Sequence, residues 1–242
     1  MLFFFLLALV CEVVGTIAGF GSSVFFVPLA GFFFDFHQVL ALTSILHVFS
    51  NAAKLMLFGK DVRLRLLLLF GVPSIAGVIA GAYLSAAITF KFDELVLGLF
   101  LIGFSAVLLR YPEVKVQPTK VNAIGAGGVA GFLAGLIGTG GALRGLALAA
   151  FNLDKGVFVG TSAGIDAGVD LSRMIIYFRK GYLASDSFVY VIGLLVIAFV
   201  GSYLGKVSLA FIDQRHFRSI VLGLVLVIGL VTFGRALVEW IS

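Results

Sequence analysis

Residues 1–34 read MLFFFLLALVCEVVGTIAGFGSSVFFVPLAGFFF, an apolar stretch with a glycine cluster, GTIAGFGSS, at 15–23. One straight helix of this length would measure about 51 Å at 1.5 Å per residue. A bilayer core is about 30 Å thick, so the stretch is too long for one crossing and too short for two complete ones. The sequence therefore predicts a glycine-broken helix or a re-entrant hairpin.

The same problem recurs in the second half of the chain. Residues 121–151 are apolar, too long for a single crossing, and carry the glycine cluster GFLAGLIGTGG at 131–141. The remaining apolar stretches each fit one crossing of about 20 residues. They span, to within a few residues, 39–58, 64–88, 95–109, 157–178, 187–204 and 219–240.

The composition independently favours a membrane protein. Hydrophobic residues make up 61% of the 242 residues and charged residues 12%, with a mean hydropathy of +1.18. Soluble domains average about half apolar and about a quarter charged residues, so we predict an all-α polytopic membrane protein. The net charge of +5 comes without a dense basic run, which argues against nucleic-acid binding. The first stretch lacks the features of a signal peptide and is expected to remain as a membrane segment.

The glycines indicate an internal duplication. The aligned pairs are Gly15 and Gly19 with Gly131 and Gly135, and Gly77 and Gly81 with Gly201 and Gly205. We expect a membrane repeat at 1–113, a polar linker at 114–120 and a second membrane repeat at 121–242. Each repeat would have a glycine-broken or re-entrant first stretch followed by about three transmembrane helices.

Re-entrant first stretches would give each half three crossings and invert the second half, whereas single crossings would make the halves parallel. With inverted halves, ten basic residues would lie on one side of the membrane and four on the other, and with parallel halves the numbers would be nine and five. The positive-inside rule therefore does not decide between the two arrangements. We favour inversion because broken stretches at corresponding positions point to a midplane binding site. The ten residues on one side would be Lys60, Arg63, Arg65, Arg110, Lys115, Lys120, Lys155, Lys206, Arg215 and Arg218. The other four are Lys91, Arg179, Lys180 and Arg235.

A second matching pattern is polar. At an offset of 119 residues, the polar positions of the stretches at 39–58 and 157–178 coincide. They are Thr43, His47, Asn51 and Lys54 in the first half, and Ser162, Asp166, Asp170 and Arg173 in the second. The spacing i, i+4, i+8, i+11 keeps each set on one helical face. Ionised groups are costly at the bilayer centre, so these stripes should face each other, water or a ligand.

The glycine clusters add expected anion-binding groups. If a helix restarts at residues 138–141, its unpaired N–H groups point into the break and favour negative charge, which Arg144 would reinforce. The first half offers Ser22 and Ser23 at the corresponding place, so the site should be asymmetric. The predicted anion-binding residues are Arg144, Arg173, Lys54, Asn51, Ser22, Ser23, Thr43, Gly138, Gly140 and Ser162.

Four ionisable residues are candidates for proton coupling: Glu12, His47, Asp166 and Asp170. The deep charges sum to zero, with Lys54, Arg144 and Arg173 set against the three acids. An arriving anion would then be favoured by protonation of an aspartate. His47 could also hold a proton near neutral pH.

Purely structural roles remain open as alternatives for these residues. The stripes could be interhelical contacts, with Asp170 paired to Arg173 at i+3. Arg144 could extend to the bilayer interface, and His47 could be a hydrogen-bonding packing residue. The functional interpretation is favoured because a local structural bond need not recur on the same face of the partner helix.

No catalytic motif is evident. The chain lacks HExxH, GxSxG, CxxC and a nucleotide-binding P-loop, so neither an enzyme nor a cofactor is expected. The single cysteine, Cys11, can form neither an intrachain disulfide nor a thiolate metal cluster, and no metal site is expected.

The order of these motifs resembles the TauE/SafE family of sulfite exporters, also called the TSUP family. In each half a glycine-rich broken stretch precedes a Thr-Ser-bearing stretch, at 43–44 and 161–162, and then a Gly-xxx-Gly stretch. The family typically shows Gly-x-Gly-Gly-Gly followed by an apolar residue and proline. Here GFGSSVFFVPL keeps Pro28 but has serines for glycines, and GTGGALRGL has Arg144 and Gly145 where proline is usual.

The resemblance implies transport of a small sulfur-containing anion, such as sulfite or a sulfoacetate-like organosulfonate, across the bacterial cytoplasmic membrane. The expected partners are this anion and the lipid bilayer. Export is favoured because expelling a monovalent anion from a negative-inside cell gains about 2.3 kcal/mol per 100 mV. An anion channel and a non-catalytic membrane assembly subunit are the alternatives. The Gly-xxx-Gly pairs are expected to be close helix contacts and could also form a homodimer surface.

Overall fold

The described residues of this computed structural model fold into a bundle of ten α-helices, without a β-strand among them. The structure describes residues 1–18, 21–58, 62–88, 90–111, 117–183, 188–208, 211 and 214–241. The helices are α1 (Leu2–Ala18), α2 (Ser23–Ala30), α3 (Phe36–Phe58), α4 (Leu64–Ser85), α5 (Phe90–Arg110), α6 (Lys120–Ile137), α7 (Gly141–Ala149), α8 (Lys155–Arg179), α9 (Phe188–Ser208) and α10 (Gln214–Ile241). The prediction of an all-α protein is confirmed.

Six of the described helices are long and apolar enough to cross a membrane. These spans are Phe36–Phe58, Leu64–Ser85, Phe92–Arg110, Lys120–Ile137, Val189–Ser208 and Ser219–Glu239. Many large apolar side chains are exposed on the outside of the bundle, among them Leu68, Val72, Ile192 and Val227. An apolar exterior of this kind matches lipid rather than water. The chain is therefore a multi-pass membrane protein.

Both long stretches break where the glycine clusters stand, as predicted. α6 ends at Ile137, and the next residue, Gly138, has φ of 75°, a left-handed conformation that favours glycine. α7 then begins at Gly141 and has nine residues. In the first half, α1 ends at Ala18 and α2 has eight residues, whereas Gly19 lies outside the described residues.

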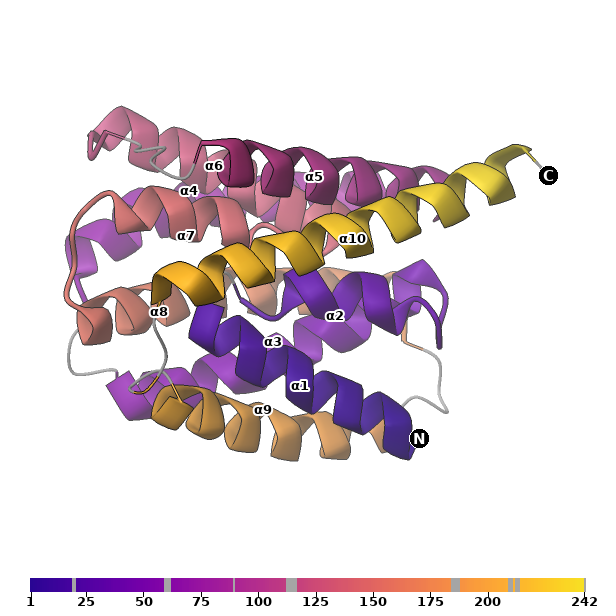
Figure 1. The fold of residues 1–242 in the computed structure, drawn as a ribbon, viewed down its shortest axis with the longest axis horizontal. Helices are drawn as coiled ribbons and strands as arrows, with labels where there is room; N and C mark the ends of the chain where they lie inside the picture. The colour runs from indigo at the N-terminus through magenta and orange to yellow at the C-terminus, as the bar shows by residue number, and fades with distance from the viewer. Residues whose placement is uncertain are drawn as a thin grey trace.

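The two short helices turn back toward the end of the bundle from which their predecessors start (Figure 1). The N-terminus and the C-terminus lie at the same end, called the terminal end below, where α1 also starts. α6 starts at the other end, called the distal end, and α7 returns to it. The α1–α2 and α6–α7 hairpins therefore point into the bundle from opposite ends.

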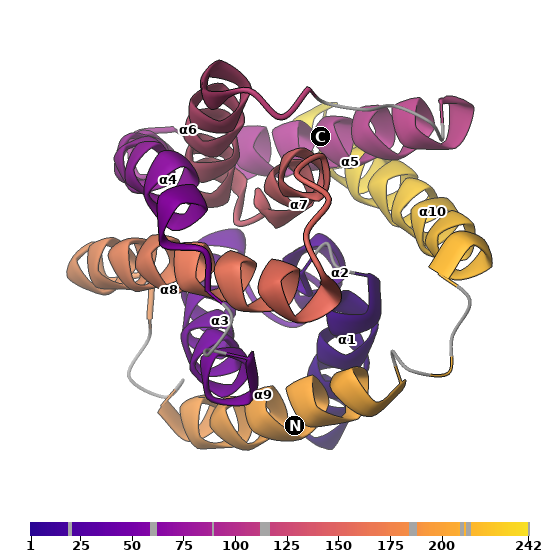
Figure 2. The ribbon, with the colours of Figure 1, turned by 90° about the vertical axis from the view of Figure 1, so that its left-hand side faces the viewer.

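Helices of the first half pack mainly on helices of the second half (Figure 2). α4 lies along α6, and α9 lies along α1. α3 packs on α8, and α5 packs on α10. The prediction that the Gly-xxx-Gly pairs are close helix contacts is confirmed. Gly77 and Gly81 lie in the α4–α6 contact, and Gly201 and Gly205 lie in the α1–α9 contact.

The α4–α6 contact brings two backbones together. A Cβ atom on Gly81 would lie 2.1 Å from the Phe132 carbonyl oxygen, and one on Gly131 would lie 2.0 Å from the Ser74 carbonyl oxygen. In the α1–α9 contact, a Cβ atom on Gly201 would lie 2.8 Å from Cγ of Glu12. The glycine faces are thus covered within the chain, and the homodimer stays a prediction.

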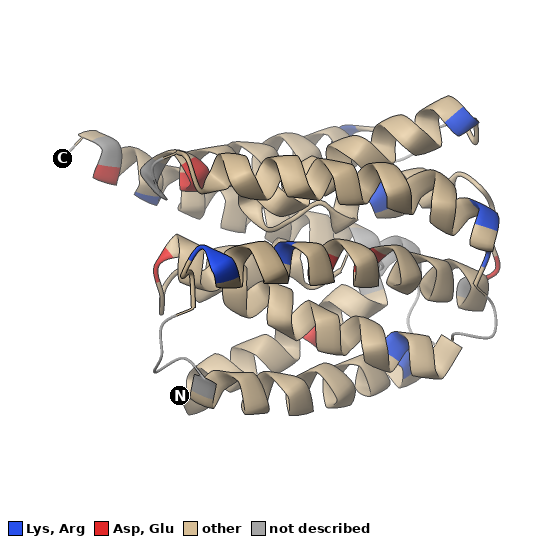
Figure 3. Ribbon diagram, turned by 180° about the vertical axis from the view of Figure 1, so that it is seen from behind, with Lys and Arg blue, Asp and Glu red and all other residues tan. Residues whose placement is uncertain are grey.

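Charged residues lie mainly toward the two ends of the bundle (Figure 3). At the distal end, the described basic residues before, at or near helix ends are Arg63, Arg65, Arg110, Lys120, Lys155, Lys206, Arg215 and Arg218. At the terminal end they are Lys91, Arg179, Lys180 and Arg235. Lys60, Lys115 and part of the predicted linker, residues 112–116, lie outside the described residues. α6 begins one residue before the predicted start of the second half, because Thr119 caps it by accepting a hydrogen bond from the Asn122 N–H.

Replacing Gly131 by alanine should destabilise the fold, because its Cβ would overlap the backbone of α4. Overpacking of this kind costs about 1–3 kcal/mol, so the midpoint of thermal unfolding in detergent should fall. Gly125 of the same helix is the control, because no described atom would lie within 4 Å of a Cβ added there. Gly125→Ala should leave the midpoint unchanged or raise it. Equal midpoints for both variants would contradict the close α4–α6 contact.

Candidate functional site

The polar stripes of α3 and α8 meet at the centre of the bundle, where each basic side chain pairs with an acid. Lys54 Nζ lies 3.0 Å from Glu12 Oε1, and Arg173 Nη2 lies 2.7 Å from Asp170 Oδ1. Arg144 Nη2 forms the third pair with Asp166 Oδ1. The six formal charges therefore sum to zero, and each is neutralised locally.

Two adjoining hollows lie between these pairs. The first, called the mouth hollow, has a volume of about 440 Å³ including its open side, and the second, the deep hollow, about 410 Å³. The hollows share Gly21, Asn51, Lys54, Gly141, Arg144 and Asp166 as lining residues.

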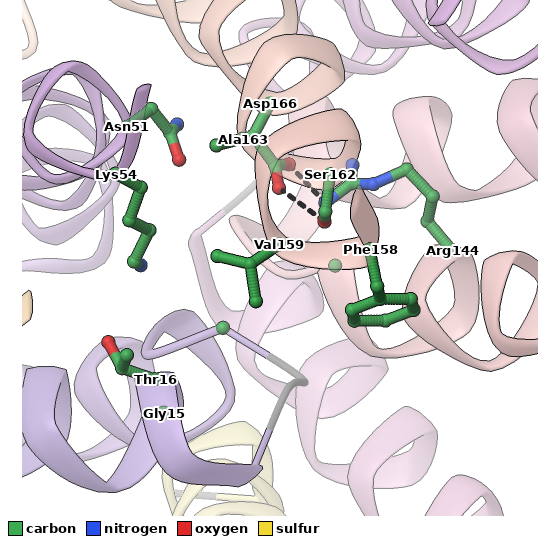
Figure 4. A pocket seen from close by; sticks show the side chains of 12 residues that line it. Gly15, Thr16, Asn51, Lys54, Arg144, Phe158, Val159, Ser162, Ala163 and Asp166 are labelled. Carbon is green, nitrogen blue, oxygen red and sulfur yellow. Dashed lines mark hydrogen bonds and ion pairs between the residues drawn. The ribbon is translucent and has the colours of Figure 1, made fainter. Parts of the chain in front are cut away.

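The mouth hollow lies toward the distal end of the bundle. Its lining includes Thr16, near the end of α1, and Phe158 and Ser162, near the start of α8. Asp166 stands between Lys54 on one side and Arg144 on the other, and it also accepts a hydrogen bond of 3.3 Å from Ser162 (Figure 4). The deep hollow continues inward to Ser22, Ser23, His47, Gly138, Gly140, Asp170 and Arg173.

Both helix breaks contribute backbone to the deep hollow. α7 starts beside it at Gly141, and its first N–H groups have no partner within the helix. The dipole of α7 and Arg144 in its first turn add positive potential at this point. α2 begins after Ser22, whose hydroxyl does not cap the helix. Helix starts with free donors favour an anion.

A chain of hydrogen bonds connects the two halves across the deep hollow. Ser22 Oγ donates to Glu12 Oε2 at 2.6 Å and lies 2.9 Å from His47 Nε2. His47 Nδ1 lies 3.3 Å from Arg173 Nη2. Arginine can only donate, so neutral His47 accepts at Nδ1 and donates from Nε2 to Ser22. A protonated His47 would instead face Asp170 Oδ2 at 3.6 Å.

Arg173 connects the site to the end of α6. Its Nη1 donates to the carbonyl oxygens of Ala134 at 3.2 Å and Gly138 at 2.9 Å. The last carbonyl groups of a helix have no hydrogen-bond donor within that helix, so Arg173 supplies a donor to the carbonyl groups at this break. The partner acid Asp170 accepts a hydrogen bond of 2.6 Å from Asn51, which joins α3 to α8.

Arg144 and Arg173 each have one N–H group without a hydrogen-bond partner in the described part of the chain. The Nε atoms of Arg144 and Arg173 are buried and have no hydrogen-bond partner among the described residues. Arg144 is 2% exposed and Arg173 1% exposed. Arg144 therefore does not extend to the bilayer interface, which removes that alternative. The predicted structural pair between Asp170 and Arg173 is present, but Arg173 also contacts α6 and His47.

Most of the predicted site residues line the two hollows, with two departures. Thr43 lines neither hollow, because its hydroxyl donates to the carbonyl oxygen of Val39 at 2.7 Å. Glu12 also lines neither hollow and is completely buried behind Lys54 and Ser22. The predicted site residues that line one or both hollows are Ser22, Ser23, His47, Asn51, Lys54, Gly138, Gly140, Arg144, Ser162, Asp166, Asp170 and Arg173.

The structure adds residues that the sequence pattern missed. Ser50 donates to Glu12 Oε1, and Ser202 of α9 donates to the same oxygen at 3.2 Å. Tyr177, one turn after Arg173, donates to the Gly135 carbonyl oxygen at 2.6 Å. Two signals could have pointed to them: Ser202 adjoins the glycine pair at 201/205, and Tyr177 continues the stripe of α8 at i+4 from Arg173.

Comparison with known families identifies the chain. No curated protein and no solved structure matches it. The family described as "Sulfite exporter TauE/SafE" matches residues 4–232, which is nearly the whole chain. The match includes all the residues that line the two hollows. The chain belongs to the TauE/SafE sulfite exporter family, a family of membrane transporters.

Proposed function

We propose that this protein exports a small sulfur-containing anion, sulfite or a sulfoacetate-like organosulfonate, which binds in the deep hollow. One observation carries the proposal. Two buried arginines from different helices, Arg144 and Arg173, line one hollow, and each has an Nε–H without a partner in the described part of the chain. Sulfonate and sulfite oxygens accept hydrogen bonds from guanidinium groups in the same way as other oxyanions. We propose transport and not catalysis at this site.

The neutral set of ion pairs determines what an anion must do to bind. An anion that approaches Arg144 competes with Asp166 for the same guanidinium, and the two negative charges repel. Protonation of Asp166 would remove both obstacles. Asp166 is the most accessible of the three acids, with a side chain 23% exposed, whereas Glu12 and Asp170 are almost fully buried. Asp166 is therefore the first candidate for proton coupling at the anion site, ahead of Asp170, His47 and Glu12.

We propose further that the halves are inverted repeats. Two observations support this: the α1–α2 and α6–α7 hairpins point inward from opposite ends, and α4 on α6 mirrors α9 on α1. In this arrangement α3 and α8 are equivalent helices that meet at the centre. Anion binding between repeats near the midplane is common among transporters of this architecture.

We propose that the distal end faces the cytoplasm, because more basic residues lie there than at the terminal end, as the positive-inside rule expects. The mouth hollow, which lies toward the distal end, would then be on the cytoplasmic side, where an exporter binds its substrate. A bacterial cytoplasmic membrane supplies the negative-inside potential that drives the anion outward.

Removal of the Arg144–Asp166 pair should weaken anion binding without leaving a lone buried charge. Compared with Asp166→Asn alone, the double variant Arg144→Gln with Asp166→Asn loses a charge-assisted hydrogen bond worth about 1.5–3 kcal/mol, which should lower sulfite affinity about 10-fold to 150-fold. The measurement is saturable sulfite efflux from proteoliposomes. Arg179→Gln, at the exposed end of α8, is the matched control and should keep wild-type kinetics. Unchanged affinity in the double variant would remove Arg144 from the site.

Anion binding should strengthen as the pH falls, because a protonated Asp166 releases Arg144 and no longer repels the ligand. Sulfoacetate is a suitable probe, since its sulfonate stays ionised from mildly acidic to mildly alkaline pH. Isothermal titration of the purified protein should show this trend in the wild type and its loss in Asp166→Asn. An Asp166→Asn protein that retains the full pH dependence would exclude Asp166 as the coupling acid.

A further inference from the structure

A second polar cluster lies at the terminal end of the bundle, away from both hollows. It consists of His37 at the start of α3, Ser85 at the end of α4, Asp93 in the first turn of α5 and Tyr182 after α8. None of these residues lines the mouth hollow or the deep hollow. They are here called the His37–Asp93 cluster.

The cluster holds most of the buried polar atoms that have no partner in the described part of the chain. They are His37 Nε2, Ser85 Oγ, both carboxylate oxygens of Asp93 and Tyr182 Oη. Asp93 and Ser85 are completely buried. His37 Nε2 lies 3.7 Å from Asp93 Oδ2, which is longer than a hydrogen bond. These groups interact only weakly with one another, Asp93 with His37 and Ser85, and Tyr182 with Ser85, so the cluster can accommodate a further proton.

A proton is the occupant that best satisfies these groups. A buried carboxylate whose donors, His37 and Ser85, form no hydrogen bond of ordinary geometry with it is unfavourable in an apolar bundle. The cluster can become neutral if one proton binds, either to the Asp93 carboxyl or to the His37 imidazole. The side chain of His37 is 29% exposed, so it can exchange protons with solvent. The dipole of α5 favours negative charge at Asp93 and thereby favours the imidazolium–carboxylate form.

Other charged groups near the cluster interact mainly with residues outside it. Glu94, the neighbour of Asp93, interacts with Arg235 and Glu239 of α10, and it also repels the carboxylate of Asp93. Lys180 at the end of α8 lies 5.3 Å above the ring of Tyr83. Among the described residues that interact with Asp93, His37 is the only basic one. The protonation of this pair therefore sets the local charge.

Aromatic rings connect the cluster to the deep hollow. Tyr182 stacks on His37 with 4.2 Å between ring centroids, and it stacks on Tyr177 with 5.2 Å. Tyr177 is completely buried and lies one helical turn from Arg173. The column of His37, Tyr182 and Tyr177 thus occupies the space between the anion site and the terminal end. In the release step proposed below, the anion leaves along this column and passes Asp93.

We propose that His37 and Asp93 form a proton-binding site that controls anion release at the terminal end. The proposal rests on the anion transport proposed above. Without the proton, the pair carries one negative charge on the exit route and repels the anion. When one proton from the terminal side binds, the pair is neutral and the repulsion disappears. Low pH at the terminal side should therefore accelerate efflux without changing the equilibrium affinity of the deep hollow.

The first test measures proton binding directly and requires no anion. Infrared difference spectra between alkaline and acidic pH should contain an Asp93 band, either of the protonated carboxyl or of a carboxylate shifted by the neighbouring imidazolium, and this band should disappear in Asp93→Asn. In His37→Gln the proton can bind only the carboxyl, so the protonated-carboxyl band should appear at higher pH than in the wild type, because the imidazolium that favours the carboxylate is gone. Glu94→Gln is the matched control and should retain the Asp93 band. Identical spectra for the wild type and Asp93→Asn would overturn the proposal.

The second test measures control of transport. Sulfoacetate efflux from proteoliposomes should depend on pH in Asp166→Asn, where the pH dependence of anion binding has been removed. Adding Asp93→Asn should abolish this remaining dependence, while adding Glu94→Gln should preserve it. Sulfoacetate affinity in the Asp93→Asn single variant should match the wild type. Efflux that keeps its pH dependence without Asp93, or that follows Na⁺ at constant pH through Asp93, would overturn the proton site.

The two tests separate the proposals. If the wild type transports no sulfur-containing anion, the transport proposal fails and the infrared spectra still decide whether Asp93 binds a proton. If transport occurs and the Asp93 band is missing, only the proton site fails.

Discussion

The structure depends on charge neutrality at the centre of an apolar bundle. Lys54, Arg144 and Arg173 each contact an acid, so no net charge remains among them. An unpaired ion in this position would cost several kcal/mol, a large fraction of the stability of an ordinary domain. The three pairs join α1 to α3 and α7 to α8 and link residues within α8. The polar centre is therefore both the proposed anion site and a part of what holds the helices in place.

The features that could be predicted from the sequence are the local ones. The helix break at Gly138 follows from an apolar stretch of unsuitable length with glycines inside it. The stripes on α3 and α8 follow from helical periodicity, which depends only on spacing. The spacing from Thr43 to Lys54 was enough to place Asn51 on the face that meets Asp170. Periodicity also predicted the inward position of Asp166.

The features that escaped prediction depend on side-chain rotamers and on which helices become neighbours. Thr43 lies on the predicted helix, but its hydroxyl bonds back to the preceding turn, a common alternative for threonine within helices. The partner of Lys54 is Glu12 on another helix, and the spacing along one helix contains no information about that pairing. Ser202 reaches Glu12 only because α9 packs on α1. The His37–Asp93 cluster likewise assembles from three regions that are distant in sequence, at His37, at 85–93 and at Tyr182.

The exchange of packing partners between the two halves has a consequence for how the chain can be divided. α4 finds its glycine-matched surface on α6, and α1 finds its partner in α9, so residues 1–111 would contain two helices without their complements. Lipid chains cannot enter a groove shaped for a bare peptide backbone as closely as another backbone can. We therefore expect that neither half folds on its own. A protein cut at the connector should work only when both fragments are produced together and reassemble.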